Sequence, residues 1–171
     1  MTIKSVRAIP YIEMKKFLQG EVTEISEFVS KFDSVWIISI TNIDTMPIVN
    51  QTAKTLPLQF DDYDPGDNGL KKAIKKGYKP LTTYQAEKIA KFVINANANI
   101  GNDLLFVNCM AGISRSGAVV DVVRNLVQIN YDEFKKLNNQ IIPNRWVKKL
   151  LFKAFENLLL NNQNSSSSSS S

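Results

Sequence analysis

The chain has 171 residues, 44% of them hydrophobic and 22% charged, so it is long enough for one well-buried domain and hardly for two. It contains no histidine and one cysteine, which excludes an internal disulfide, the usual zinc sites and any Ser-His-Asp or Cys-His catalytic arrangement. The net charge of +5 is modest, and we interpret it as solvated surface, with steering of an anionic phosphoprotein or nucleic acid as the minority interpretation. No apolar run approaches the ~20 residues of a membrane span and no signal peptide is evident, so we expect a cytoplasmic protein without membrane contact.

The first third of the chain predicts strands and one helix. The apolar residues within residues 1–20 do not repeat at a clear helical or strand spacing. An edge strand followed by a helical turn nevertheless fits their positions. Thr23 is a suitable N-cap for a short helix over residues 24–32. A continuous apolar run at residues 35–40 predicts a strand covered on both faces, and a second strand is expected over residues 55–60.

The remainder predicts one further strand and four helices. The first helix begins with a capping box of Thr82 and Gln85 and ends near residues 95–99, and a strand follows at 104–107. The next helix begins at about Ser116, and a short helix capped by Asn130 with Glu133 follows it. A final helix comes after the turn at 141–144.

This alternation predicts an α/β fold with a central, mostly parallel sheet of about four or five strands flanked by helices. Ligands of such sheets bind at the carboxyl ends of the strands. We expect residues 1–160 to form a single domain. Residues 161–171 contain only Asn, Gln and Ser, which cannot bury enough surface to offset their ordering entropy, so a disordered tail is expected there.

The most informative stretch is the loop that follows the strand at 104–107. It begins with the only thiol, Cys109, and closes on Arg115. The backbone N–H groups that can converge on one anion beside the sulfur belong to Met110, Ala111, Gly112, Ile113, Ser114 and Arg115. The dipole of the following helix and the Arg115 guanidinium would both stabilise a thiolate, so the loop predicts an oxyanion site with a sulfur nucleophile.

Residues 109–116 resemble the phosphate-binding signature of cysteine-dependent protein tyrosine phosphatases, and residues 111–116 resemble its dual-specificity branch. The resemblance covers roughly residues 33–160 and leaves residues 1–30 unmatched. It implies a tyrosine-phosphatase-like fold and a phosphorylated protein as substrate. Phosphotyrosine is the expected target, with phosphoserine and phosphothreonine added by dual specificity, and no metal or organic cofactor is needed.

The same resemblance implies the catalytic roles. Cys109 would attack phosphorus and form a phosphocysteine, while Arg115 and the loop amides hold the phosphate oxygens. The hydroxyl of Ser116 would hydrogen-bond the sulfur and ease its departure as thiolate. An aspartate on another loop would protonate the leaving oxygen and then activate water.

That aspartate is expected on the acidic surface loop at residues 61–69. The hydrophobic-x-hydrophobic-x-Asp spacing of the resemblance places Asp62 in this role, with Asp61 as the runner-up. Asp64 and Asp67 stay open, because the loop is longer than usual; for Asp64, which precedes Pro-Gly, a solvated turn is the preferred interpretation.

One residue departs from the signature, since Asn108 stands where the family usually has histidine. We expect the Asn108 amide to order the loop by hydrogen bonding without adding positive charge. The pKa of the Cys109 thiol should then be less depressed than with histidine, and turnover slower.

Two other functions stay open. A pseudophosphatase that binds phosphoproteins without hydrolysing them is favoured by Asn108 and opposed by the presence of both Cys109 and Arg115. RNA 5′-triphosphatase activity is supported only by the basic residues, so nucleic acid is an unfavoured partner. Because the loop contains no lysine, multiply charged phosphoinositide headgroups are disfavoured as well.

Overall fold

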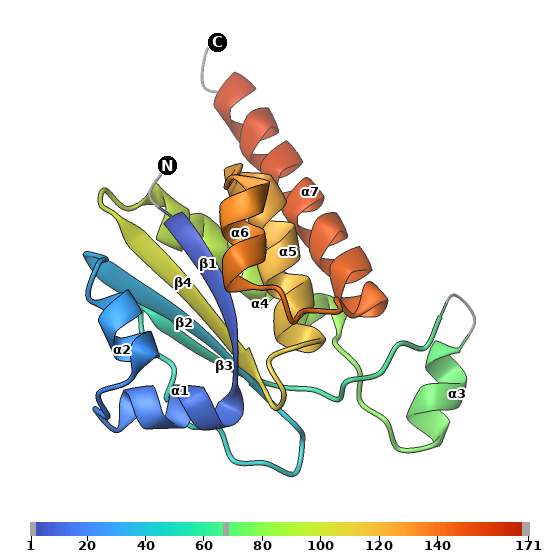
Figure 1. Cartoon of the computed structure of the whole chain (residues 1–171). Coiled ribbons are helices and arrows are strands. Elements are labelled where there is room, and N and C mark those ends of the chain that lie inside the picture. Colours follow the sequence, from blue (N-terminus) through green and yellow to red (C-terminus); the bar gives the residue numbers. More distant parts are fainter. Residues whose placement is uncertain (1–2, 67–68, 169–171) are drawn as a thin grey trace.

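A computed structural model describes residues 3–66 and 69–168 of the chain, which form an α/β structure around a parallel sheet (Figure 1). The strands are β1 (Ile3–Pro10), β2 (Ser34–Thr41), β3 (Thr55–Gln59) and β4 (Asp103–Cys109), in the order β1-β4-β2-β3. The helices are α1 (Tyr11–Leu18), α2 (Glu24–Val29), α3 (Leu70–Lys75), α4 (Thr83–Ala98), α5 (Arg115–Val127), α6 (Tyr131–Leu137) and α7 (Arg145–Ser167). The predicted fold class is confirmed, with four strands in the sheet.

Strand β4 lies between β1 and β2, and every residue from Asp103 to Cys109 is buried. Cys109 pairs with Pro10 at the end of β1, and Asn108 pairs with Ser39 near the end of β2. Because all four strands are parallel, their carboxyl ends lie at one edge of the sheet, where ligands bind in folds of this type.

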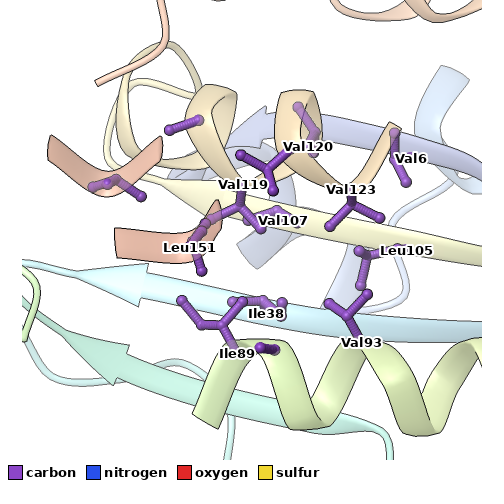
Figure 2. Packing of buried hydrophobic residues seen from close by; sticks show 14 of the residues in the cluster. Val6, Ile38, Ile89, Val93, Leu105, Val107, Val119, Val120, Val123 and Leu151 are labelled. Atoms are coloured by element: carbon purple, nitrogen blue, oxygen red, sulfur yellow. The ribbon is translucent and has the colours of Figure 1, made fainter. Parts of the chain in front are cut away.

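Helices cover both faces of the sheet, α1 and α2 on one side and α4 to α7 on the other (Figure 1). Figure 2 shows the larger core, in which Val119 and Val123 of α5 and Ile89 and Val93 of α4 pack on the strands. The four-residue spacing within each helix places these side chains on one face. Apolar residues cover both sides of β2 and β4, which explains their nearly continuous apolar sequences.

The predicted helix starts are confirmed. Thr23 caps α2, and Thr82 with Gln85 forms a capping box at the start of α4. Asn130 caps α6, and its side chain accepts hydrogen bonds from the backbone of Asp132 and Glu133. In each case a side-chain oxygen satisfies N–H groups that the first helical turn leaves unpaired.

The structure differs from expectation at two places. Helix α7 continues to Ser167, through most of the segment expected to be disordered from residue 161; residues 169–171 lie outside the described residues. This extension continues a helix that is already nucleated, so no new nucleation cost arises. Helix α3 lies in a lysine-rich stretch for which no helix is predicted. Among the described helices, none is both long and apolar enough to cross a membrane.

Candidate active site

The candidate nucleophile lies at the carboxyl end of β4. Cys109 is 2% exposed, and its Sγ lies 3.1 Å from the Oγ of Ser116 in the first turn of α5. The loop between them turns at Gly112, which has a φ of +69°. A Cβ on Gly112 would lie 2.5 Å from the backbone of Ile9 and Pro10, so a larger residue would push the loop away from β1.

The surroundings of Cys109 favour its thiolate. Burial raises the pKa of the Cys109 thiol, whereas hydrogen bonds from the Ser116 hydroxyl and from the backbone of Ser116 and Ile113 lower it, as does the charge of Arg115. The lowering contributions prevail, so the pKa lies below the ordinary cysteine value. Because the thiolate is the nucleophilic form, Cys109 is chemically suited to attack an electrophile.

Arg115 is a buried cation, and not all of its hydrogen-bond donors have an acceptor among the described residues. It is 4% exposed, and its Nη1 donates to the carbonyl oxygen of Phe60 at 2.7 Å. Its Nε has no partner, and no carboxylate lies within 4.0 Å of its guanidinium, in the part of the chain that the structure describes. A buried charge without a counterion is energetically unfavourable, so binding of an anion next to the Arg115 guanidinium would be favourable.

The loop backbone offers further donors to such an anion. The N–H groups of Met110, Ala111, Gly112 and Ser114 donate to no protein acceptor among residues 3–66 and 69–168. Successive free N–H groups in a curved loop, followed by a helix N-terminus, form an anion-binding concavity. Met110 and Ala111 are exposed at the rim of the loop, so its mouth is open to solvent.

The structure brings Asp62 to this loop. One carboxylate oxygen of Asp62, Oδ1, accepts a 2.8 Å hydrogen bond from the Ser114 hydroxyl and a 2.9 Å bond from the Asn144 side-chain amide. The other carboxylate oxygen, Oδ2, takes part in neither bond. Asp62 is exposed, so its carboxyl can reach a ligand bound at the mouth of the loop.

The other acidic residues point to different partners. Asp61 accepts a 2.8 Å hydrogen bond from the backbone N–H of Lys79, which makes it a support of the acidic loop. Asp64 is paired with Arg145 at 3.0 Å. Asp67 lies outside the described residues. In the described residues no three His, Cys, Asp or Glu side chains form a group that could hold a metal ion.

Asn108 corrects one expectation. The amide was expected to order the loop, yet Asn108 is fully buried and neither its Oδ1 nor its Nδ2 has a hydrogen-bond partner among the described residues. The neighbouring strands place Ile9 and Ser39 beside Asn108, and neither residue forms a hydrogen bond with its amide. The hydroxyl of Ser39 is also buried without a partner in the same part of the chain.

The segment before α7 supports the loop in a way that the sequence did not reveal. The Gln140 side chain donates to the carbonyl oxygens of Ala8 and Gly112 at 3.0 and 3.1 Å. The backbone N–H of Asn144 donates to the carbonyl of Ser114 at 3.1 Å, and its side chain both binds Asp62 and caps α7. Asn144 is recognisable from sequence as a helix cap, but nothing in the sequence indicates its contact with Asp62.

Comparison with known proteins gave structural matches only. No protein-family model matches the sequence, and no curated protein matches it either. PTPMT1, in a structure with PI(5)P, shares 17% identity over 93% of this chain and 95% of its own, with a TM-score of 0.48. The human tyrosine phosphatase-like serine/threonine/tyrosine-interacting protein shares 17% identity over 91% of this chain and 93% of its own, with a TM-score of 0.47.

The PTP-2 phosphatase of Cydia pomonella is also similar, with 17% identity over 86% of this chain and 84% of its own and a TM-score of 0.47.

Proposed function

We propose that this protein is a cysteine-dependent phosphatase of the protein tyrosine phosphatase superfamily, which hydrolyses phosphotyrosine, and phosphoserine or phosphothreonine, in proteins. The observation that carries the proposal is the buried Arg115: its Nε has no partner among the described residues, and its charge contributes to the lowered pKa of the Cys109 thiol. A phosphate dianion would supply the missing counterion, and its oxygens would accept from the free loop amides.

In the first step, the Cys109 thiolate attacks phosphorus in line with the leaving oxygen. An S–P bond forms and the ester O–P bond breaks, while Asp62 gives its proton to the departing phenol or alcohol oxygen. Arg115 and the loop amides hold the equatorial phosphate oxygens throughout, where negative charge is spread in the transition state.

In the second step, water attacks the phosphocysteine. Asp62, now a carboxylate, takes a proton from that water as the new O–P bond forms and the S–P bond breaks. The hydrogen bond from Ser116 Oγ, at 3.1 Å, stabilises the departing Cys109 thiolate. The products are the dephosphorylated side chain and inorganic phosphate, and the enzyme returns to its starting state.

Exposure at the mouth of the loop supports a broad choice of phosphoresidue. Met110, Ala111 and Asp62 are all exposed, so no described side chain at these three positions closes the mouth of the loop. A short phosphoserine could reach Cys109 there as well as a long phosphotyrosine. We therefore propose dual specificity, which the signature of residues 111–116 also predicts.

The deciding experiment measures phosphate release from a small aryl phosphate by the wild type and by Cys109→Ser. We expect the variant to lose at least about a thousandfold in kcat, because the serine hydroxyl is a far weaker nucleophile without a general base beside it. Equal release by both proteins would overturn the proposal.

The same experiment separates the enzyme from a phosphoprotein-binding pseudophosphatase. The Asn108 amide, which has no partner among the described residues, favours a pure binder, since the hydrogen bond expected to order the loop is missing. A wild type that binds a phosphotyrosine peptide but releases no phosphate would establish the binder instead.

A further inference from the structure

Beside the candidate active site lies an apolar groove that the reaction does not use. It has a volume of about 550 Å³ and is formed by α3, the segment that links α3 to α4, and the first turns of α7. Its apolar lining includes Leu70, Ile74, Tyr78, Leu81, Trp146 and Leu150. Ile74 is 59% exposed and Tyr78 is 44% exposed, so this apolar surface is accessible to a partner. Figure 1 shows α3 standing away from the layers that cover the sheet.

The first turn of α7 joins the groove to the candidate site. Trp146 lines the groove, and its indole N–H donates to the carbonyl of Leu81 at 3.0 Å, which fixes the ring. Two residues earlier, the Asn144 side chain donates to Asp62 at 2.9 Å. A peptide that contacts Trp146 would therefore need only a few more residues to reach the mouth of the loop at residues 109–115.

The opposite lip of the groove is tied to the acidic loop. Lys79 and Asp61 exchange two hydrogen bonds, one through the backbone at 2.7 Å and one from the Lys79 N–H to the Asp61 carboxylate at 2.8 Å. The rings of Tyr78 and Tyr63 stack with centroids 4.6 Å apart. Asp62, the proposed acid, thus lies between two residues that hold the lip of the groove.

The charged residues of α3 and of the segment that follows it are all basic. The basic residues of α3 and the following segment are Lys71, Lys72, Lys75, Lys76 and Lys79. Residues 69–82 contain no acidic residue, and none of these lysines has a carboxylate within 4.0 Å in the part of the chain that the structure describes. Such a cluster attracts and orients an acidic partner.

We propose that this groove binds a segment of the substrate phosphoprotein in which a large apolar side chain is flanked by acidic residues. The inference rests on the proposed function, because it assigns the groove to the substrate of that site. The apolar lining would take the side chain, and the lysines of α3 would pair with its acidic neighbours. The phosphoresidue, a few positions away, would then lie over Cys109.

Two other occupants fit less well. A second copy of this chain carries the same net charge of +5 and would bring like charges together around the groove. Helix α7 does not fold back on the groove, because it begins there and runs away from α3 to its end at Ser167 (Figure 1).

The experiment compares phosphotyrosine peptides that share one core and differ only in flanking residues. One set has leucine or phenylalanine among glutamates on either side of the phosphotyrosine, and the other has serine and glycine at these positions. We expect the acidic apolar set to have about tenfold higher kcat/KM, mainly through KM, and the preference to fall as salt is raised.

Paired variants locate the effect. Ile74→Ser and the double variant Lys71→Glu/Lys75→Glu should each remove most of the preference, while hydrolysis of a small aryl phosphate stays within about twofold of wild type. The controls are Ile100→Ser, at a fully exposed apolar position, and Lys4→Glu/Lys15→Glu, which changes net charge equally on β1 and α1. Both controls should keep the preference.

The experiments distinguish failure of the groove proposal from failure of the proposed phosphatase function. Equal kcat/KM for the two peptide sets, or the same loss in variants and controls, would overturn the groove proposal while leaving the phosphatase intact. If the wild type hydrolyses no aryl phosphate, the proposed function fails, and peptide affinity for Cys109→Ser then tests the groove alone. Tighter binding of acidic vesicles or RNA than of the peptides, or a dimer that Ile74→Ser dissociates, would also overturn it.

Discussion

The guanidinium of Arg115 donates a 2.7 Å hydrogen bond to the backbone carbonyl of Phe60, two residues before Asp62. Phe60 is 1% exposed and belongs to the main core, so this carbonyl has a fixed position. The bond links the loop at residues 109–115 to the loop that carries the proposed acid. The same side chain therefore joins the two loops and, in the proposed mechanism, directs its remaining N–H groups to the phosphate.

Arg115→Lys should lower kcat/KM by about a hundredfold or more, because lysine keeps the charge but cannot bond Phe60 and a phosphate with a planar fork. The measurement is steady-state hydrolysis of a small aryl phosphate. Arg124→Lys is the control, since Arg124 lies on the same helix and pairs with Asp121 instead of facing the site. A loss of similar size in both variants would show that the effect is structural.

The lowered pKa of Cys109 predicts the pH dependence of its reactivity. Since only the thiolate reacts, alkylation of the folded protein should reach its plateau at lower pH than alkylation of the urea-unfolded chain. Ser116→Ala removes a hydrogen bond that stabilises the thiolate, so the midpoint should move to higher pH. Cys109 is the only cysteine, which makes the labelling specific. A midpoint that does not move in Ser116→Ala would contradict this account.

Asp62→Asn and Asp61→Asn form a matched pair. Asp62→Asn removes the proposed proton donor and should lower kcat about a hundredfold for alkyl phosphates, with a smaller loss for a good aryl leaving group. In Asp61→Asn the side-chain oxygen can still accept from the Lys79 N–H, so activity should be nearly unchanged. Measuring both variants on both substrates decides the role, and the reverse result would move it to Asp61.

Local patterns in the sequence predicted the strands at residues 35–40 and 104–107, the helix caps and the position of the loop between Cys109 and α5, because each depends on neighbouring residues only. The contacts of Asn144 and Gln140 could not be predicted, since they join segments far apart in the chain. The lack of a partner for the Asn108 amide among the described residues was also unpredictable, because a hydrogen bond depends on what the adjacent strands place beside it.

Gly112→Ala should lower the stability of the protein by more than the cost of placing alanine at a positive φ. Forcing alanine into a left-handed conformation costs about 1–2 kcal/mol, and at Gly112 the new methyl would also meet the backbone of Ile9 and Pro10. Gly20→Ala is the control, because Gly20 has a φ of +78° and its new methyl would meet no described atom within 4 Å. Urea unfolding should show a larger loss of stability for Gly112→Ala, and aryl phosphate hydrolysis should fall only there. Equal destabilisation would mean that the loop can shift to make room.

Asn108→Leu should stabilise the protein, because it removes a fully buried amide that has no partner among the described residues. A gain of about 1–3 kcal/mol in the free energy of unfolding is expected, measured by urea denaturation. Asn138→Leu is the matched control: Asn138 is 2% exposed, but it accepts from the N–H of Ala8 and donates to the carbonyls of Val6 and Phe134, so its replacement should destabilise by a similar amount. Opposite signs for the two variants would establish that the Asn108 amide is unsatisfied. Destabilisation in both would mean that a partner holds it, and that Asn108 does order the phosphate-binding loop.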